Sequence, residues 1–485
     1  MGEGRQMDPA PKLRIPAEVH HFFTSPGGHS LIVRGNAGAG KTTFALQVIE
    51  DLAATERGYY FSTRVSDHAL LNHFPWLEQK LVGGAIKNGN NGNRSGLSRL
   101  KGLGAQPSNS QKKVMTISIG KDLGDLEDLY KLVEGSEGRL LVVIDSIDAL
   151  ADRYGLSYAN LISALQKDLV EGKGANLLYV LENSDQGLDY LGDGVVIVSR
   201  GEFNRRRVRE IDLLKMRGCE IAQPKYLFTL KGGRIQTFAY GADQHAPAMN
   251  GWKAVMDNDG RVSSGIMDLD RVLAGGLPRG STVLVELGQS VPSSVGGMLE
   301  QSLVANFVAL GRGVVWVPTR KAGAEAMRAQ MSSSLTKDQF ERFVRIPEIA
   351  SQVEVSAPYI MAVEGTDAGA DLKWKNLSYS LSGTEAPFLS LLGFDTLEST
   401  YGPNVMDQLT DHVGMMKRQK GVCVAITSPS SHSVRKLNDL ANLHVKVERL
   451  GGTVVLYGEE PFTECNALAI EERGQGGKLS LTPIV

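Results

Sequence analysis

The sequence predicts an α/β fold made of two successive domains, each with a mostly parallel sheet covered by helices. Short apolar runs alternate with helical stretches, a glycine-rich loop joins a strand to a helix, and the second half repeats the order of the first. With 485 residues, the chain is long enough for two or three domains. Its composition, 42% hydrophobic and 22% charged, is typical of a soluble globular protein.

Charge and cysteine content narrow the class of protein. The net charge is -2, so binding to nucleic acid or to an anionic membrane would need a local basic patch. The three cysteines are far apart and show neither metal-site nor disulfide spacing. The first eleven residues are polar, and no apolar run approaches the ~18 residues that span a bilayer. We therefore expect a cytoplasmic protein without membrane contact.

The most specific motif is a phosphate-binding loop at Gly35–Thr42. It follows the predicted strand Leu31–Val33 and precedes a helical stretch that begins near Phe44, which is the context this motif requires. The glycines let the backbone turn its N–H groups toward an anion, while Lys41 would reach the β- and γ-phosphates and Thr42 would bind Mg²⁺. ATP and Mg²⁺ are therefore the expected cofactors. The predicted binding residues are Gly35, Asn36, Ala37, Gly38, Ala39, Gly40, Lys41, Thr42 and Thr43.

A second predicted site residue ends an apolar strand. Asp145 follows the run Leu140–Ile144, and in this class of proteins such an aspartate holds Mg²⁺ directly or through water. The alternative role for Asp145 is to cap the next helix. Other strands of the same sheet are predicted at Gly58–Arg64, Asn176–Leu181 and Val195–Val198.

Two further segments resemble the RecA-superfamily ATPases of the KaiC and RadA type. Asp189–Val195 resembles their DYLADGV sequence, and Lys215–Gly218 resembles their KMRG sequence. The resemblance implies that Lys215 and Arg217 are catalytic and reach the γ-phosphate bound by a neighbouring subunit. It also implies a homo-oligomer, for which a hexameric ring is one candidate.

One departure from the KaiC pattern concerns the general base. KaiC-type enzymes place two glutamates after the second core strand, but here Arg64 and Val65 stand there. Because a missing general base costs ~10²–10⁴ in rate, we expect slow hydrolysis, suited to a switch. Asp67, Asp148 and Glu182 are the candidate replacements. Glu182, directly after a predicted strand, is the preferred one, and its alternative role is a solvated loop acid.

A closer resemblance is to the archaeal gas-vesicle regulator family GvpD. It rests on Ile15–Leu31, Ser62–Ser66 and Leu456–Pro461, and it covers most of the chain. It implies a phosphate-loop regulator that represses gas-vesicle formation by acting on a transcription activator. The leading hypothesis is therefore a slow ATPase that restrains a partner protein. A DNA-acting ATPase related to recombinases and a nucleotide-stabilised scaffold without turnover are the alternatives.

The second half resembles a KaiC-type domain that has lost its nucleotide chemistry. Ser264–Gly280 is similar to the start of such domains, and the strand Thr282–Leu287 leads to Gly288–Gly297 in place of a phosphate loop. That segment has no lysine before a hydroxyl residue, and Pro292 lacks an N–H donor. Tyr457–Glu459 stand where Lys-Met-Arg would. We expect a degenerate RecA-like domain for assembly or partner binding, with weak nucleotide binding as the alternative.

Domain boundaries follow from these segments. We predict a flexible tail at 1–10, a phosphate-loop ATPase domain at 11–242, a linker at 243–257 and the degenerate domain at 258–485. Within the first domain, 87–113 is rich in Gly, Asn and Ser and contains no acidic or aromatic residue. This composition predicts a mobile basic insertion.

Five arginines lie within ten residues: Arg200, Arg205, Arg206, Arg207 and Arg209. Because Val208–Met216 is predicted as a strand, Asn204–Arg207 should form a hairpin turn. We expect the arginines to bind an acidic protein partner through charge-assisted hydrogen bonds. Subunit contacts, nucleic acid and a plain solvated turn are the alternatives, although only Phe203 is near enough to stack on a base.

Overall fold

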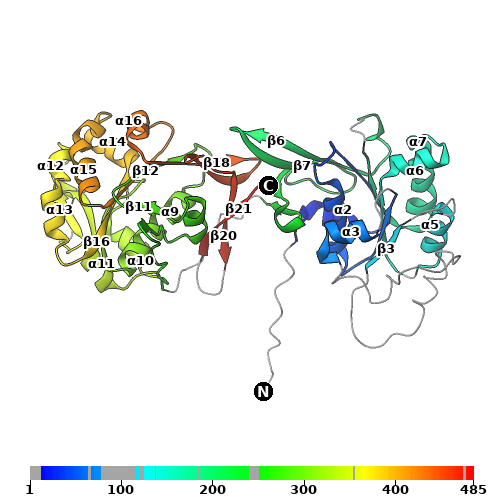
Figure 1. Ribbon diagram of the computed structural model, residues 1–485, viewed down its shortest axis with the longest axis horizontal. Coiled ribbons are helices and arrows are strands. Elements are labelled where there is room, and N and C mark those ends of the chain that lie inside the picture. The colour runs from blue at the N-terminus through cyan, green and yellow to red at the C-terminus, as the bar shows by residue number, and fades with distance from the viewer. Residues whose placement is uncertain are drawn as a thin grey trace, which may run out of the picture. The chain divides into compact units, whose positions relative to one another are not determined.

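The chain forms two compact units, Met1–Ala239 with Ile484–Val485, and Tyr240–Pro483 (Figure 1). The computed structural model describes residues 13–63, 67–77, 115–119, 125–136, 138–182, 186–239, 251–352, 356–472 and 477–485. The tail predicted at 1–10, the basic insertion at 87–113 and the first part of the linker at 243–257 lie outside the described residues.

Within its described residues, the first unit is built on a nine-stranded sheet in the order β3-β2-β4-β5-β1-β6-β7-β8-β9. Neighbours from β3 to β6 in this order are parallel, and those from β6 to β9 are antiparallel. This is the mostly parallel sheet that the sequence predicts. Its strands are β1 Ser30–Arg34, β2 Arg57–Ser62, β3 Met115–Ile119, β4 Leu140–Asp145, β5 Asn176–Val180, β6 Gly194–Phe203, β7 Arg206–Met216, β8 Lys225–Thr229 and β9 Gln236–Phe238.

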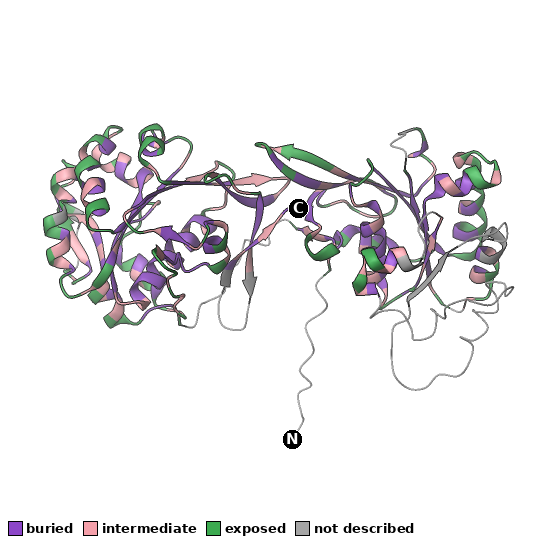
Figure 2. Ribbon diagram, in the orientation of Figure 1, coloured by how far each residue is buried: buried purple, intermediate pink, exposed green. Residues whose placement is uncertain are grey.

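Helices cover both faces of this sheet, and its central strands are buried (Figure 2). Successive residues of β1 alternate between the faces: Leu31 and Val33 belong to the core cluster of α1 and α2, and Ile32 belongs to that of α5, α6 and α7. The helices are α1 Ala17–Thr24, α2 Lys41–Leu52, α3 Asp67–His73, α5 Asp125–Glu134, α6 Ile147–Tyr154 and α7 Tyr158–Leu165. In the described part of the chain, no helix has the length and apolarity of a membrane span.

Strands β6 and β7 form a hairpin that continues past the end of β1. The pairing of β6 with β1 stops where Ile197 lies opposite Arg34. From there β6 runs on to Phe203, paired with β7 alone. The tip of the hairpin therefore lies beyond the sheet edge at which β1 ends and the phosphate loop begins.

The turn of this hairpin is shorter than the sequence predicts. Asn204 and Arg205 have φ of 47° and 64°, the left-handed conformation of a two-residue hairpin turn. Pairing resumes at Arg206, opposite Phe203. The predicted turn Asn204–Arg207 was thus two residues too long, because Arg206 and Arg207 already belong to β7.

The second unit repeats the strand order of the first, with a ten-stranded sheet in the order β15-β14-β13-β16-β17-β12-β18-β19-β20-β21 within its described residues. Strand β12 lies between β17 and β18 and is parallel to both, as β1 lies between β5 and β6. Strands β13, β14 and β16 take the places of β2, β3 and β4. The predicted internal repeat is therefore confirmed as a repeat of fold.

The elements of the second unit have the following bounds. Its sheet strands are β12 Thr282–Leu287, β13 Arg312–Val317, β14 Val344–Ile349, β15 Ile360–Val363, β16 Glu385–Gly393, β17 Val422–Thr427, β18 Leu443–Leu450, β19 Thr453–Glu460, β20 Asn466–Glu472 and β21 Gly477–Pro483, with β10 Arg261–Val262 and β11 Leu277–Pro278 paired separately. Its helices are α8 Met267–Val272, α9 Ser293–Ala309, α10 Ala324–Met331, α11 Lys337–Phe343, α12 Ala368–Asp371, α13 Trp374–Ser380, α14 Phe394–Tyr401, α15 Val405–Arg418 and α16 Val434–Leu440.

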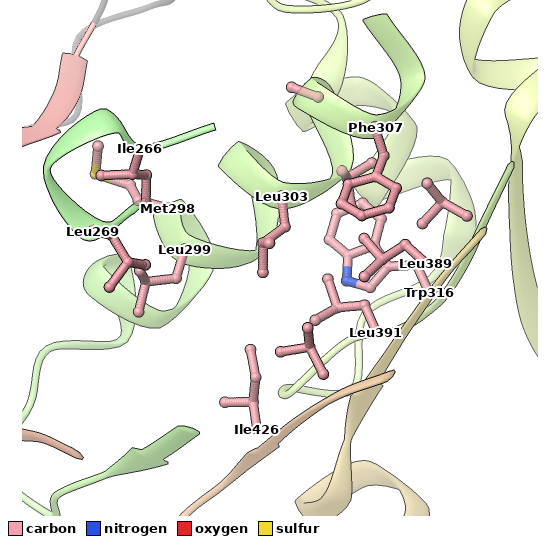
Figure 3. Packing of buried hydrophobic residues seen from close by; sticks show 14 of the residues in the cluster. Ile266, Leu269, Met298, Leu299, Leu303, Phe307, Trp316, Leu389, Leu391 and Ile426 are labelled. Carbon is pink, nitrogen blue, oxygen red and sulfur yellow. The ribbon is translucent and has the colours of Figure 1, made fainter. Parts of the chain in front are cut away.

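The core of the second unit is apolar. Leu303 and Phe307 of α9 lie in one cluster with Trp316 of β13 and with Leu389 and Leu391 of β16 (Figure 3). An apolar cavity of about 30 Å³ within this cluster is lined by side chains of α8, α9 and the strands β11, β12, β17, β18 and β19. The cavity holds about one water-sized group, so it is a small packing gap and not a nucleotide pocket.

Candidate nucleotide site

The loop between β1 and α2 has the backbone of an anion nest. Gly35, Gly38 and Gly40 have φ of 148°, 72° and 114°, which side chains other than glycine rarely adopt. A Cβ on Gly35 would also lie 1.9 Å from Val198 O of β6, so only glycine fits there. Among the described residues, no acceptor is found for the N–H groups of Ala37, Gly38 and Gly40. These donors, at the N-terminus of α2, suit a phosphate.

Lys41 is the first residue of α2 and is 6% exposed. Its Nζ donates to Gly35 O at 2.7 Å and to Asn36 O at 3.2 Å, so the side chain folds back over the loop. No Asp or Glu in the described part of the chain makes an ion pair with this ammonium. A phosphate held by the loop would supply the missing negative charge.

Asp145 lies at the end of β4, directly across from the start of α2. Its Oδ2 accepts hydrogen bonds from Thr42 Oγ1 at 2.7 Å and from Tyr60 OH at 2.6 Å. Burial raises the pKa of this carboxyl, and the hydrogen bonds from Tyr60 and Thr42 oppose the rise. A carboxylate and a hydroxyl in contact are the hard oxygen ligands that Mg²⁺ prefers, so these residues fit a Mg²⁺ ion bound directly or through water.

Tyr60 was not among the site residues predicted from the sequence. It lies on β2, 1% exposed, and burial raises the pKa of its phenol well above the ordinary value, so it acts as a donor. Ser62 pairs with Asp145 in the β2–β4 register, and Tyr60 shares a face with Ser62 because it is two residues earlier. A tyrosine at this spacing was the signal that could have identified it.

Glu182 follows β5, the strand between β1 and β4, and it is exposed. Its charge raises the pKa of Asp145, so the two carboxyls lie at the same sheet edge. Asp148 is buried, and its Oδ2 accepts the backbone N–H of Glu182 at 2.7 Å. Glu182 thus lies at the sheet edge of Asp145, and Asp148 supports the segment that carries it; the role of Glu182 as a general base remains a prediction.

Asp148 and Asp67, the other two candidates for the general base, also remain predictions. Arg64 and Val65, which stand where KaiC-type enzymes have glutamates, lie outside the described residues. Asp67 begins α3, but its side chain is likewise not described.

The charged groups of Lys215 and Arg217 lie away from the phosphate loop of their own chain. Lys215 pairs with Val195, which lies opposite Ile32 in the middle of β1, and Arg217 directly follows the end of β7, whereas the loop follows the end of β1. Lys215 Nζ donates to Gly192 O at 2.6 Å, and Arg217 Nη1 donates to Asp193 Oδ1 at 2.9 Å. Both cations are therefore held on the side of Gly192 and Asp193, just before β6, and away from the phosphate loop of the same chain. Their role in a neighbouring site remains a prediction.

The five clustered arginines differ in their exposure to solvent. Arg200, Arg205 and Arg207 are exposed, whereas Arg206 and Arg209 are only 3% and 7% exposed. Arg206 Nη1 donates to Asn204 O across the turn at 2.7 Å. The five predicted partner-binding arginines therefore do not form one exposed surface.

The second unit lacks the counterpart of this site. The segment between β12 and α9 is 288–292, one residue shorter than 35–40, and α9 begins with Ser293 where α2 begins with Lys41. Asp395, just after β16, accepts a hydrogen bond from Ser428 Oγ at 2.9 Å. The fold of a nucleotide domain is kept without the lysine that would neutralise phosphate.

Fold and site together define the class. Strand β5 lies between β1, which leads into the phosphate loop, and β4, which ends in Asp145. The loop and the carboxylate lie at the same edge of the sheet, and this arrangement identifies a RecA-like P-loop protein. The comparison with protein families agrees: residues 19–214 match the family model "GvpD gas vesicle protein, P-loop domain", and residues 251–357 match "GvpD basic region 2". The chain belongs to the GvpD family.

Individual relatives support both the GvpD family and the wider class of RecA-like P-loop proteins. Protein GvpD2 of Halobacterium salinarum is 25% identical over 502 aligned positions, which cover 97% of this chain and 96% of that protein. Protein GvpD1 of the same organism is 22% identical over 540 positions, with 97% of each chain covered. The circadian clock oscillator protein KaiC of Parathermosynechococcus lividus is 24% identical over 341 positions, 65% of this chain and 56% of that protein. The resemblances to GvpD and to KaiC are therefore confirmed.

Proposed function

We propose that this protein binds ATP with Mg²⁺ and acts as a slowly hydrolysing regulatory switch that restrains a partner protein in the control of gas vesicles. The observation that carries the nucleotide part is the contact of Thr42 with Asp145 beside the buried ammonium of Lys41. The regulatory part is supported by the near full-length similarity to two GvpD proteins. A transcription activator is the candidate partner.

Different residues of the site would bind the phosphates, the Mg²⁺ ion and the attacking water. The N–H groups of the loop and the N-terminus of α2 would bind the phosphates, and Lys41 would turn from the loop carbonyls toward the β- and γ-phosphates. Thr42 and Asp145 would hold Mg²⁺, which when bound neutralises phosphate charge. Glu182 would orient or deprotonate the attacking water.

Turnover is proposed to depend on assembly. The charged groups of Lys215 and Arg217 lie away from the phosphate loop of their own chain, so they would act on the nucleotide of a neighbouring subunit in a homo-oligomer. An arginine supplied in this way is worth roughly 10³–10⁵ in rate in related NTPases. Loss of the γ-phosphate would then change the contact between subunits.

The partner is proposed to be acidic and to bind the exposed end of the β6–β7 hairpin. Arg205 and Arg207 are exposed there, and guanidinium groups bind carboxylates through paired hydrogen bonds. The hairpin also borders the phosphate loop, so the nucleotide and the partner could influence each other. The cytoplasm is the proposed location.

The test is Lys41→Ala, with Lys167→Ala as the matched control because Lys167 is an exposed lysine far from the loop in sequence. Calorimetry should show no ATP binding for Lys41→Ala, and repression in cells should be lost with it. The control should match the wild type in both measurements. Repression that survives intact in Lys41→Ala would exclude the ATP switch, and hydrolysis stimulated by single-stranded DNA would favour a DNA-acting ATPase instead.

A further inference from the structure

Arg209 ties the β6–β7 hairpin to the phosphate loop. Its Nη1 donates to Ala39 O at 3.0 Å and to Gly38 O at 3.3 Å. Its Nε donates to the backbone oxygen of Val485 at 2.6 Å. One guanidinium thus holds two carbonyls of the loop, whose N–H groups are the predicted phosphate donors.

The face of the hairpin that carries Arg209 also carries two other arginines. Arg200 lies directly opposite Arg209 in the antiparallel ladder, and Arg207 is two residues before it. Side chains alternate along a strand, so all three share one face, and the contacts of Arg209 show that this face is turned to the loop. Arg200 Nη1 lies 3.9 Å from where a Cβ on Gly38 would stand.

This group of arginines has an excess of positive charge. Burial lowers the pKa of Arg209, and the nearby charges of Arg207 and Arg200 lower it further. Among the described residues, no Asp or Glu makes an ion pair with Arg200 or Arg209, and Glu202 lies opposite Arg207 in the ladder without an ion pair. Repulsion among guanidinium groups beside an anion nest is relieved when an anion binds.

We propose that Arg200 binds the phosphate tail of the nucleotide held by the loop of the same chain, and that Arg209 is the positioning residue that fixes the hairpin for this contact. The proposal rests on the nucleotide binding proposed above. It assigns Arg200 and Arg209 to the nucleotide site, whereas the sequence analysis assigned them to the partner-binding surface. The exposed Arg205 and Arg207 remain for a partner, so one hairpin would join the two sites.

The test measures MgATP binding to the full chain by calorimetry in wild type, Arg200→Ala and Arg205→Ala. Arg205→Ala is the matched control because this substitution removes the same charge from the same hairpin, but at the turn. A hydrogen bond from a charged donor typically contributes about 10-fold or more to affinity, so Arg200→Ala should raise Kd by at least that factor. Arg205→Ala should leave Kd unchanged. Arg200→Lys, which keeps the charge without the planar fork, should give an intermediate Kd.

The positioning role of Arg209 needs a separate measurement. Arg209→Lys keeps the charge but cannot bond all three carbonyls, so it should also weaken binding. In that background the further effect of Arg200→Ala should shrink, because the two residues act as a unit. Independent, additive effects would overturn the positioning role.

The outcomes separate the two proposals. If the wild type binds MgATP and Arg200→Ala binds equally well, the phosphate contact is wrong and the proposed function stands. If Arg205→Ala weakens binding as much as Arg200→Ala, the effect is general charge and the contact is again wrong. If the wild type binds no nucleotide, both proposals fail.

Discussion

The phenol of Tyr60 donates a 2.6 Å hydrogen bond to Asp145 Oδ2, the oxygen that also accepts the hydroxyl of Thr42. A residue of the second strand thereby sets the orientation of the carboxylate that ends the fourth. With Mg²⁺ bound, Thr42 would turn its oxygen toward the ion, and Tyr60 would still hold Asp145 in place. Asp145 is therefore positioned by Tyr60 of β2 as well as by Thr42, the residue that follows the loop lysine.

Tyr60→Phe should weaken Mg²⁺-dependent ATP binding several-fold and leave binding without Mg²⁺ nearly unchanged. The lost hydrogen bond should also lower the free energy of unfolding by about 1 kcal/mol. Calorimetry with and without Mg²⁺, together with urea unfolding, checks both effects. Tyr59→Phe is the control, since Tyr59 points to the other face of β2. Equal Mg²⁺ dependence in the two variants would remove Tyr60 from the site.

Asp145→Asn should abolish most of the Mg²⁺ dependence of ATP binding while it stabilises the protein without ligand at neutral pH. Burial raises the pKa of Asp145 above 3.8, so the folded state disfavours the ionised carboxyl. The contribution of this group to stability is present below pH 3.8 and is lost as the pH rises through its raised folded pKa. Thermal unfolding of both proteins across this range should show a growing advantage for the asparagine variant. A variant less stable than wild type at neutral pH would contradict this account.

Glu182→Gln should reduce hydrolysis by roughly 10²–10⁴ with little change in ATP affinity, because a glutamine cannot accept the proton of the attacking water. Single-turnover assays and calorimetry separate the two effects. Asp148→Asn serves as the comparison, since Asp148 Oδ2 accepts the backbone N–H of Glu182 and so supports its segment. Its effect on rate should be smaller. Wild-type turnover in Glu182→Gln would place the base elsewhere.

Arg217→Ala should bind ATP as the wild type does and hydrolyse it poorly. Mixing it with Lys41→Ala provides the sharper measurement. The Arg217→Ala subunit can still bind ATP through Lys41, and the Lys41→Ala subunit can still supply Arg217. If Arg217 acts on a neighbouring subunit, the mixture should hydrolyse ATP faster than the sum of the two separate proteins. Turnover equal to that sum would show that no trans contact operates.

Local features were enough to predict the phosphate loop, Asp145 and most core strands. Strand, glycine loop and helix follow one another within about twenty residues, and the order of those residues alone limits the backbone that can form. The repeat in the second half was likewise visible, because apolar runs recur in the same order. Its missing lysine could be read directly, at Ser293 and the residues before it.

The placement of the arginines could not be predicted in this way. Arg209 meets Gly38 across 171 residues of sequence, and this contact depends on how far β6 extends past β1. The register between two strands, set by the packing of the whole sheet, decides which arginines reach the loop.

Residues close together in the chain were sufficient to identify the phosphate loop, the carboxylate at Asp145 and a second domain without the lysine of the loop, because each of these features is local. Three relationships became visible only in the folded chain: Tyr60 supports Asp145, Arg200 and Arg209 face the loop, and the charged groups of Lys215 and Arg217 lie away from it. Those relationships arise where strands distant in sequence are brought into register by the burial of their apolar faces.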